Sequence, residues 1–376
     1  MHILFLTNEY PKKGLNGGGI GSFVQFLGCA LVKEGVAVSV VGINNSSENE
    51  FEIDAGVAVH RLSKSTCKVG KFYDNTKRIL SKISEINKGN TVDVVEGSEL
   101  NFAFFPKKTT YKKVIRLHGG HHFFAIELNK KPALWRGFQE KQSFKKADGY
   151  IAVSNYVGMQ TQKYLKSKFK FTTIYNSVDT QKFKPIGTFP VVKNSLLFVG
   201  TVCEKKGIRQ LVQAMPLIKK EIPDVTLKIV GRDWLFPNGD SYIEYLNSFI
   251  TNEVKSAIEI VGAVPLHKMS EHLSAAAICV YPSQTESFGL TVIEALLMQK
   301  PVVCSKIPPF LEIKGEQEIL KAIDTTSVDK IATEIVALLK SENKAVHMGE
   351  MARKEILIRF NPEMIVNQNI NFYKNL

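Results

Sequence analysis

Short apolar runs rich in β-branched residues alternate with stretches of helical spacing along most of the 376-residue chain. Such runs, bounded by polar segments, are typical of strands buried on both faces of a parallel sheet. The pattern therefore predicts an α/β fold. In the first half the expected strands are His2–Leu6, Val36–Val41, Val57–Leu62, Val92–Val95, Lys113–Leu117 and Gly149–Val153, and the expected helices are Phe23–Lys33 and Asn75–Ile86.

The same alternation returns in the second half, after an interruption at Asp179–Pro190 that contains Gly187 and two prolines. Single cores stop growing near ~250–300 residues, so two domains are expected, 1–180 and 187–358. A final helical segment, about 360–376, is expected to pack back on the first domain. The expected second-half strands are Leu196–Val199, Thr226–Val230, Ile258–Val261, Ile278–Tyr281 and Pro301–Ser305, and the helices are Gln210–Ile218, Glu271–Ala276 and Thr291–Met298.

Composition narrows the class of protein. No apolar run reaches the ~18 residues of a membrane span, and the first residues lack the basic region of a signal peptide. The cysteines are five, scattered, and never in a C-x-x-C pair. These features predict a cytoplasmic protein with reduced thiols and no zinc knuckle.

The charge is strongly asymmetric. The net charge is +13, and residues 1–180 hold 26 Lys+Arg against 15 Asp+Glu, a net +11. A basic first half could attract an anionic membrane, an anionic substrate or nucleic acid, or could serve solubility alone. We find no nucleic-acid-binding motif and no interleaving of aromatic and basic residues along the chain, so nucleic acid is not the expected partner.

The most informative segment is residues 281–295, YPSQTESFGLTVIEA. An expected strand ends at Tyr281, and a helix begins near Gly289. The backbone N–H groups of Phe288, Gly289 and Leu290 would then form a phosphate site at the helix N-terminus. Glu286 precedes this helix.

This stretch resembles the Glu-x7-Glu signature of retaining GT-B glycosyltransferases, most closely family 4, which includes mannosyl-, glucosyl- and galactosyltransferases. The resemblance implies two Rossmann-like doubly wound domains that face each other across a cleft. It also implies that Glu286 binds hydroxyls of the donor sugar and that Glu294 binds the nucleotide ribose. Two solvated carboxylates at a helix end are the alternative interpretation, but the whole context favours function.

A second matching segment, residues 198–207 with the sequence FVGTVCEKKG, presents a lysine before a glycine after a strand. Lys206 could neutralise a diphosphate leaving group as its charge develops. The family normally has arginine at the position of Thr201. Either Thr201 contributes only a hydroxyl or Lys205 compensates.

Three weaker similarities agree. Residues 16–21, NGGGIG, resemble the family's glycine loop and place Gly18 and Gly19 beside the transferred sugar. A dinucleotide fingerprint is the competing interpretation, but its frame would require glycine at Ser22. Residues 174–179, IYNSVD, resemble the family's Asn-Gly-Val-Asp hinge. Arg232 ends a strand where the nucleotide base rests in the family.

His118 follows an expected strand and matches a histidine near the donor sugar in the family. A packed loop histidine is the alternative. The neighbouring His121 and His122 suggest a metal site, but one loop without zinc-enzyme spacing does not support it, so no metal or cofactor is expected. The chain departs from the family at Gln299 and at Pro308-Pro309, which we expect around the donor pocket.

The resulting hypothesis is a retaining hexosyltransferase of surface polysaccharide or glycoconjugate synthesis. We expect a nucleotide-sugar donor, UDP-sugar before GDP-mannose, and a saccharide or lipid-linked saccharide acceptor. By analogy with relatives that build lipid-linked products, the basic first half predicts peripheral association with the inner face of an anionic membrane. A nucleotide-sugar epimerase of the same fold and a basic nucleic-acid-binding protein are the alternatives.

Overall fold

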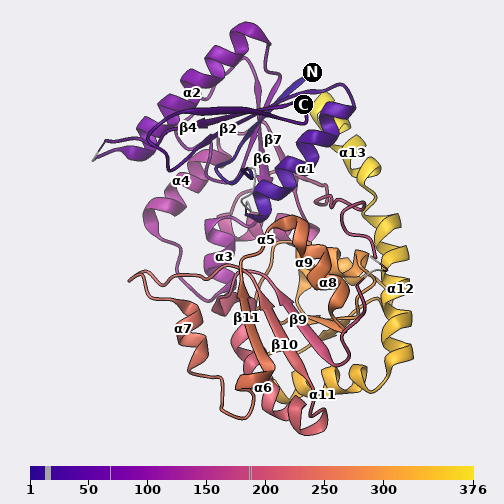
Figure 1. Ribbon diagram of the computed structural model, residues 1–376. Coiled ribbons are helices and arrows are strands. Elements are labelled where there is room, and N and C mark those ends of the chain that lie inside the picture. Colours follow the sequence, from indigo (N-terminus) through magenta and orange to yellow (C-terminus); the bar gives the residue numbers. More distant parts are fainter. Residues whose placement is uncertain (13–17, 68, 186, 188) are drawn as a thin grey trace. The chain divides into compact units, whose positions relative to one another are not determined.

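The computed structural model describes residues 1–12, 18–67, 69–185, 187 and 189–376 (Figure 1). The chain divides into two compact units. Unit 1 comprises Met1–Ser177 and Pro362–Leu376, and unit 2 comprises Val178–Asn361. The chain thus leaves unit 1 within the residues 174–179 and returns to it with its last helix.

Unit 1 contains an eight-stranded sheet of order β3-β4-β2-β1-β5-β6-β7-β8. All neighbours are parallel except β3, which pairs antiparallel with β4 at the edge. The six strands expected from the apolar runs are present, and the short β8 and the edge strand β3 are additional. The strands are β1 His2–Leu6, β2 Ala37–Ile43, β3 Glu50–Asp54, β4 Val57–Leu62, β5 Val94–Gly97, β6 Lys112–Leu117, β7 Gly149–Ala152 and β8 Thr172–Thr173.

The helices of unit 1 cover this sheet. They are α1 Gly19–Lys33, α2 Lys71–Gly89, α3 His121–Glu127, α4 Leu134–Phe144, α5 Asn155–Leu165 and α13 Pro362–Lys374. Figure 1 shows α13 beside α1. The buried Arg116 on β6 holds α13 through hydrogen bonds to Asn369 Oδ1 (2.5 Å) and Tyr373 Oη (3.2 Å), while it pairs with Glu96 at 2.7 Å. Breaking this buried network would leave an unpaired charge in the core.

Unit 2 contains a parallel six-stranded sheet of order β11-β10-β9-β12-β13-β14. The order reverses between β9 and β12, and ligands of such sheets bind outside the carboxyl ends of the strands at this switch point. The strands are β9 Ser195–Val199, β10 Thr226–Val230, β11 Ile258–Gly262, β12 Ile278–Tyr281, β13 Val302–Ser305 and β14 Lys321–Ile323.

The helices of unit 2 bury apolar faces against this sheet, and Leu211, Met215 and Ile218 of α6 lie in one core cluster with Phe198 and Ile229 of the strands. The helices are α6 Ile208–Glu221, α7 Tyr242–Asn247, α8 Met269–Ala275, α9 Leu290–Leu297, α10 Pro308–Lys314, α11 Val328–Leu339 and α12 Glu342–Arg359, with 3-10 turns η1 Glu204–Lys206, η2 Lys255–Ala257 and η3 Leu266–Lys268. Of the described helices, none has the length and apolar character needed to cross a membrane.

Candidate functional site

The loops after β9 and β12 lie directly against each other at the switch point of unit 2. Gly207 has a φ of +68°, and a Cβ atom there would lie 1.8 Å from the carbonyl oxygen of Pro282. The backbone N–H of Gln284 donates to the carbonyl of Lys205 at 2.8 Å. Glycine at position 207 is therefore required for the two loops to approach so closely.

This approach brings Lys206 and Glu286 together. Lys206 Nζ lies 2.5 Å from Glu286 Oε1, which also accepts a hydrogen bond from Ser283 Oγ at 2.9 Å. Glu286 is 8% exposed. Burial opposes ionisation of its carboxyl, but the ammonium groups of Lys206 and Lys205 hold its pKa below the usual value. The Lys206 ammonium and the Glu286 carboxylate therefore form an ion pair at the edge of the candidate site.

Lys205 precedes Lys206 in η1, and Thr201 and Arg232 follow the neighbouring strands β9 and β10. Burial lowers the pKa of Lys205. The end of β9 and the end of β10 abut, because a Cβ atom on Gly231 would lie 1.7 Å from the carbonyl oxygen of Gly200. Val202, which follows Thr201, donates its N–H to the carbonyl of Arg232 at 2.9 Å. Arg232 is exposed, so its side chain is accessible to a ligand at this edge.

Helix α9 begins at Leu290, with Gly289 as its N-cap at a φ of +110°. A Cβ atom on Gly289 would lie 2.6 Å from the ring of Phe310. Phe288 is buried and its ring packs 5.8 Å from that of Phe360. These contacts fix the first turn, whose early N–H groups have no partner within the helix and can bind an anion.

Glu294 lies inside α9 and differs from Glu286 in its electrostatics. Burial raises the pKa of Glu294 to about 8, and only Lys182 opposes the shift. A protonated carboxyl suits a neutral hydroxyl group of a ligand better than a phosphate.

In unit 1, the three histidines after β6 make different contacts. The ring of His118 packs edge-on against Phe23 at 5.9 Å, and burial followed by the nearby Arg116 lowers its pKa to about 3. His121 Nε2 accepts the backbone N–H of Ala133 at 2.8 Å. Across the described parts of the chain, no group of three or more His, Cys, Asp or Glu side chains could hold a metal ion.

Two buried carboxyl groups beneath these histidines are functional candidates that the sequence analysis missed. Glu140 Oε2 pairs with His122 Nδ1 at 2.5 Å and accepts the His122 backbone N–H at 2.9 Å. Glu99, just after β5, has a pKa raised to about 8, chiefly by burial and further by the charge of Glu140. Each of the two residues has one buried carboxyl oxygen without a partner. The position of Glu99 after a strand was the only sequence signal.

The glycine loop is described only from residue 18 onward, so the positions 16 and 17 of the expected loop lie outside the described residues. Gly18 is the N-cap of α1. A Cβ atom on Gly18 would lie 2.0 Å from Glu9 Oε2, whereas Gly19 faces open space. At the N-terminus of α1, the Glu9 carboxylate therefore lies close to Gly18, and the backbone at Gly19 is accessible.

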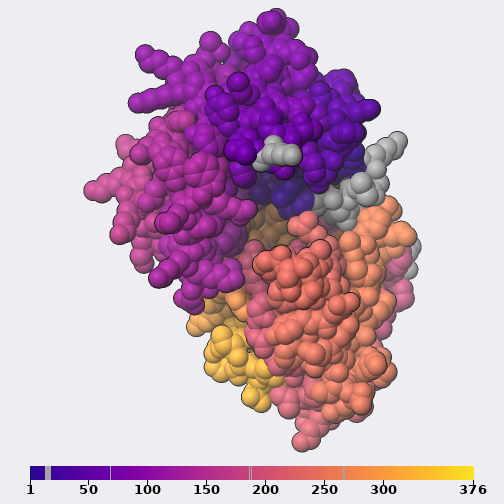
Figure 2. Space-filling view, turned by 90° about the vertical axis from the view of Figure 1, so that its left-hand side faces the viewer, coloured from indigo at the N-terminus to yellow at the C-terminus, as the bar shows by residue number. Residues whose placement is uncertain are grey.

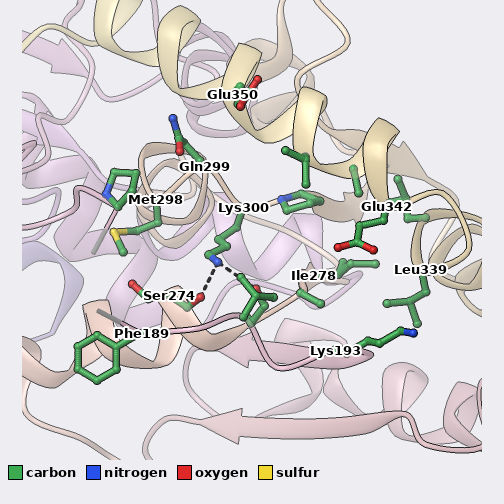
Figure 3. Close-up of a pocket in the computed structure, with 18 of the residues that line it drawn as sticks. Phe189, Lys193, Ser274, Ile278, Met298, Gln299, Lys300, Leu339, Glu342 and Glu350 are labelled. Atoms are coloured by element: carbon green, nitrogen blue, oxygen red, sulfur yellow. Dashed lines mark hydrogen bonds between the residues drawn. The ribbon is translucent and has the colours of Figure 1, made fainter. Parts of the chain in front are cut away.

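A cavity of about 420 Å³ in unit 2 lies at the opposite edge of the sheet, near the amino ends of β12 and β13 (Figure 3). Buried Lys300 donates to the carbonyls of Ser274 (2.6 Å) and Ala276 (3.1 Å), which end α8. Gln299 lines this cavity at a φ of +58°. The expectation that Gln299 lies around the donor pocket is therefore wrong, because it precedes β13, whereas Pro308 and Pro309 follow that strand.

Comparison with known proteins agrees with this geometry. Residues 179–355 match the family described as "Glycosyl transferases group 1", and residues 17–182 match "Glycosyltransferase Family 4". The O-antigen chain mannosyltransferase B of Escherichia coli is 32% identical over 48% of this chain and 45% of its own length.

Solved structures show the same fold. Sucrose-phosphate synthase from Thermosynechococcus elongatus has a TM-score of 0.82 at 19% identity and covers 100% of this chain and 98% of its own. HepE of Anabaena, in complex with UDP and glucose, has a TM-score of 0.75 at 16% identity, with coverage of 100% and 99%. The chain belongs to the family 4 glycosyltransferases and is a transferase with the GT-B fold.

Proposed function

We propose that the chain transfers a hexose from a nucleotide-sugar donor to a saccharide or lipid-linked saccharide with retention of anomeric configuration. The observation that carries the proposal is the Lys206–Glu286 pair beside the N-terminus of α9, with Glu294 deeper in the same helix. The cation and the helix N-terminus suit a diphosphate. The two carboxyl groups, which differ in protonation, suit the hydroxyl groups of a sugar and of a ribose.

In this proposal Lys206 and the first turn of α9 bind the diphosphate. Lys206 stabilises the charge that develops on the leaving group, an interaction stronger in the transition state than in the ground state. Glu286 binds hydroxyls of the sugar, and Glu294 binds the ribose. The acceptor attacks from the face that the diphosphate leaves, and the leaving phosphate takes the acceptor proton.

We propose that the reaction needs no metal ion. The supporting observation is the donor set: lysines stand where a metal enzyme would place acidic ligands, and the described residues contain no acidic or histidine cluster suited to a cation. The uncharged His118, with its pKa near 3, would offer a hydrogen bond to a sugar hydroxyl or to the departing oxygen.

UDP-sugar is the favoured donor, because HepE, which shares the fold, is known in complex with UDP and glucose. GDP-mannose is the second candidate, because a 32% identical relative is a mannosyltransferase of O-antigen chains. The same relative supports an acceptor in surface polysaccharide synthesis. The net charge of +11 over residues 1–180 supports peripheral association with an anionic membrane at the cytoplasmic face.

Calorimetric titration of UDP, GDP, ADP and their sugars tests the proposal. One nucleotide should bind, and Glu294→Ala should weaken that binding at least about tenfold through loss of the ribose contact. Absence of any nucleotide binding would contradict the proposal and direct attention to nucleic acid.

Incubation with the binding donor alone separates transfer from epimerisation, since an epimerase would convert the donor without an acceptor. With an acceptor present, the proton NMR spectrum of the first product reports the anomeric configuration. Retention supports the proposed stereochemistry, and inversion contradicts it.

A further inference from the structure

Helix α4 exposes apolar side chains on its outer face while it buries polar ones. Its buried face carries Gln139, Glu140 and Ser143 together with Phe144. Its outer face carries Leu134, Trp135 and Phe138, which are 92%, 55% and 49% exposed. A surface helix normally buries its apolar side, so this outer face points to a partner that is itself apolar.

The exposed rings of α4 continue onto two other segments of unit 1. Trp135 stacks on Phe138, with ring centroids 5.8 Å apart. Phe104 lies 6.1 Å from Trp135, and Tyr73, at the start of α2, lies 6.4 Å from Phe104. Figure 2 views the molecule from the side on which α2 and α4 lie in Figure 1. Three segments distant in sequence thus form one aromatic surface.

Basic side chains lie on the same three segments as these rings. Lys77 Nζ lies 5.6 Å from the ring centroid of Tyr73. The only acidic residue in 128–146 is Glu140, which is fully buried, so this stretch presents positive charge alone. The exposed cations of the three segments are Lys71, Lys77, Lys107, Lys108, Lys130, Lys131, Arg136, Lys141 and Lys145. The folded chain therefore interleaves aromatic and basic residues, which the linear sequence did not reveal.

We propose that this aromatic–basic surface, formed by Leu134, Trp135, Phe138, Phe104 and Tyr73 with the lysines of the same segments, is the part of the protein that inserts into an anionic bilayer. The inference deepens the proposed function and rests on it for the membrane-linked acceptor. Trp and Tyr favour the water–lipid interface, and each nearby Lys or Arg adds attraction to anionic headgroups.

The same observations disfavour nucleic acid and a protein partner. Bases stack on free ring faces, and the mutual stacking of Trp135 and Phe138, with an interplanar angle of 20°, covers one face of each ring. Protein interfaces are depleted of lysine at their centres, whereas lysines occur on all three segments here. An aliphatic side chain as exposed as Leu134 suits acyl chains better than either.

The inner face of α4 connects this surface to the histidine loop. Glu140 on that face holds both the ring and the backbone N–H of His122. His122 lies four residues after His118 at the end of β6. A membrane-anchored acceptor would therefore meet the candidate site of unit 1 one helix away from the lipid surface.

Co-sedimentation of the full chain with phosphatidylcholine vesicles, with and without about a third phosphatidylglycerol, tests the inference. The wild type should bind the anionic vesicles and be released by high salt only in part, because inserted rings do not respond to screening. The double variant Trp135→Ser/Phe138→Ser should lose at least about tenfold in partitioning.

The matched control is Phe51→Ser/Ile53→Ser, which removes two exposed apolar side chains, each 61% exposed, from the edge strand β3 of the same unit. It should bind vesicles as the wild type does. Calorimetric donor binding should be unchanged in both double variants, which separates this inference from the proposed function, and far-UV circular dichroism equal to that of the wild type shows that the variants fold.

In a Trp234→Phe background, Trp135 becomes the only tryptophan, and its fluorescence should shift to the blue on adding anionic vesicles. Equal loss of binding in the two double variants would overturn the inference. So would an unshifted spectrum, binding to a single-stranded oligonucleotide but not to vesicles, or self-association that the Trp135→Ser/Phe138→Ser change abolishes.

Discussion

The candidate site of unit 2 carries an ion pair at its edge, whereas in unit 1 two of the buried titratable groups, His118 and Glu99, are uncharged near neutral pH. In unit 2, Lys206 and Glu286 form an ion pair at 2.5 Å on two abutting loops. In unit 1, His118 is neutral with a pKa of about 3, and the carboxyl of Glu99 beneath it has a pKa of about 8. Under the proposed function, this difference corresponds to two roles: unit 2 neutralises a charged leaving group, and His118 of unit 1 offers a hydrogen bond to an uncharged sugar.

Removing the cation of unit 2 should have the largest effect. Lys206→Met should lower the rate of transfer about 10²–10³-fold, since it removes charge stabilisation from the leaving group. The change also leaves Glu286 buried without its ion-pair partner, so thermal unfolding should be followed alongside the rate.

Two further variants serve as controls for the rate of Lys206→Met. Lys206→Arg keeps the charge and should recover part of the rate. Lys228→Met breaks an exposed ion pair with Glu259 in the same unit and should leave the rate unchanged. If Lys206→Met transferred sugar at a rate within threefold of the wild type, the charge of Lys206 would not contribute to transfer.

The buried carboxyl of Glu99 should make stability depend on pH. Its raised pKa means that the folded chain keeps a proton that the unfolded chain loses between about pH 4.5 and 8, so stability falls as pH rises through this window. Each pKa unit corresponds to about 1.4 kcal/mol, and Glu99→Gln should remove a few kcal/mol of this loss.

Melting temperatures of wild type and Glu99→Gln at pH 5 and pH 8 provide the measurement. The wild type should lose more stability than the variant over that interval. Glu294→Gln is the counterpart in unit 2, because Glu294 also has a pKa of about 8. Parallel curves for wild type and Glu99→Gln would show that Glu99 is ionised in the folded chain.

The neutral His118 should give a smaller, pH-independent effect. His118→Ala should lower transfer about tenfold by removing one hydrogen bond. Between pH 5 and 7, the pH–rate profiles of the wild type and of His118→Ala should have the same shape. The wild type should show no additional acidic limb in this range. Such a limb would mean that this histidine is protonated during the reaction. The site of unit 1 would then carry a charged group, as the site of unit 2 does.

The smallest effect should come from surface ion pairs outside both sites. Lys340→Ala removes an exposed partner of Glu221 at 2.7 Å and should leave the free energy of unfolding nearly unchanged. Chemical denaturation measures this change. A clear loss of stability would show that charge outside the sites also matters.

Much of unit 2 could be predicted from the sequence. Its strand–loop–helix segments place Glu286 and Gly289 by local rules of strand ends and helix starts. Helices α10, α11 and α12 were not predicted, although Ile331, Ile335 and Leu338 of α11 have helical spacing and are buried. The position of Gln299 was misjudged because sequence distance from a motif does not say which edge of a sheet a residue occupies.

Unit 1 was harder for a physical reason. Glu99 and Glu140 are 41 positions apart and acquire their properties only when folding buries them together, so no local pattern relates them. Helix α4 shows the same limit. Its apolar residues have helical spacing, but spacing alone does not reveal that this face points outward.

Hydrogen exchange followed by mass spectrometry, with and without the binding nucleotide, tests the central claim most directly. That claim places the nucleotide at the carboxyl edge of the unit 2 sheet. Slowed exchange should appear in the segments 200–207 and 281–294. The segments 298–301 and 338–346, which line the cavity at the opposite edge, should exchange as before. Protection confined to the cavity segments, or to unit 1, would contradict the account.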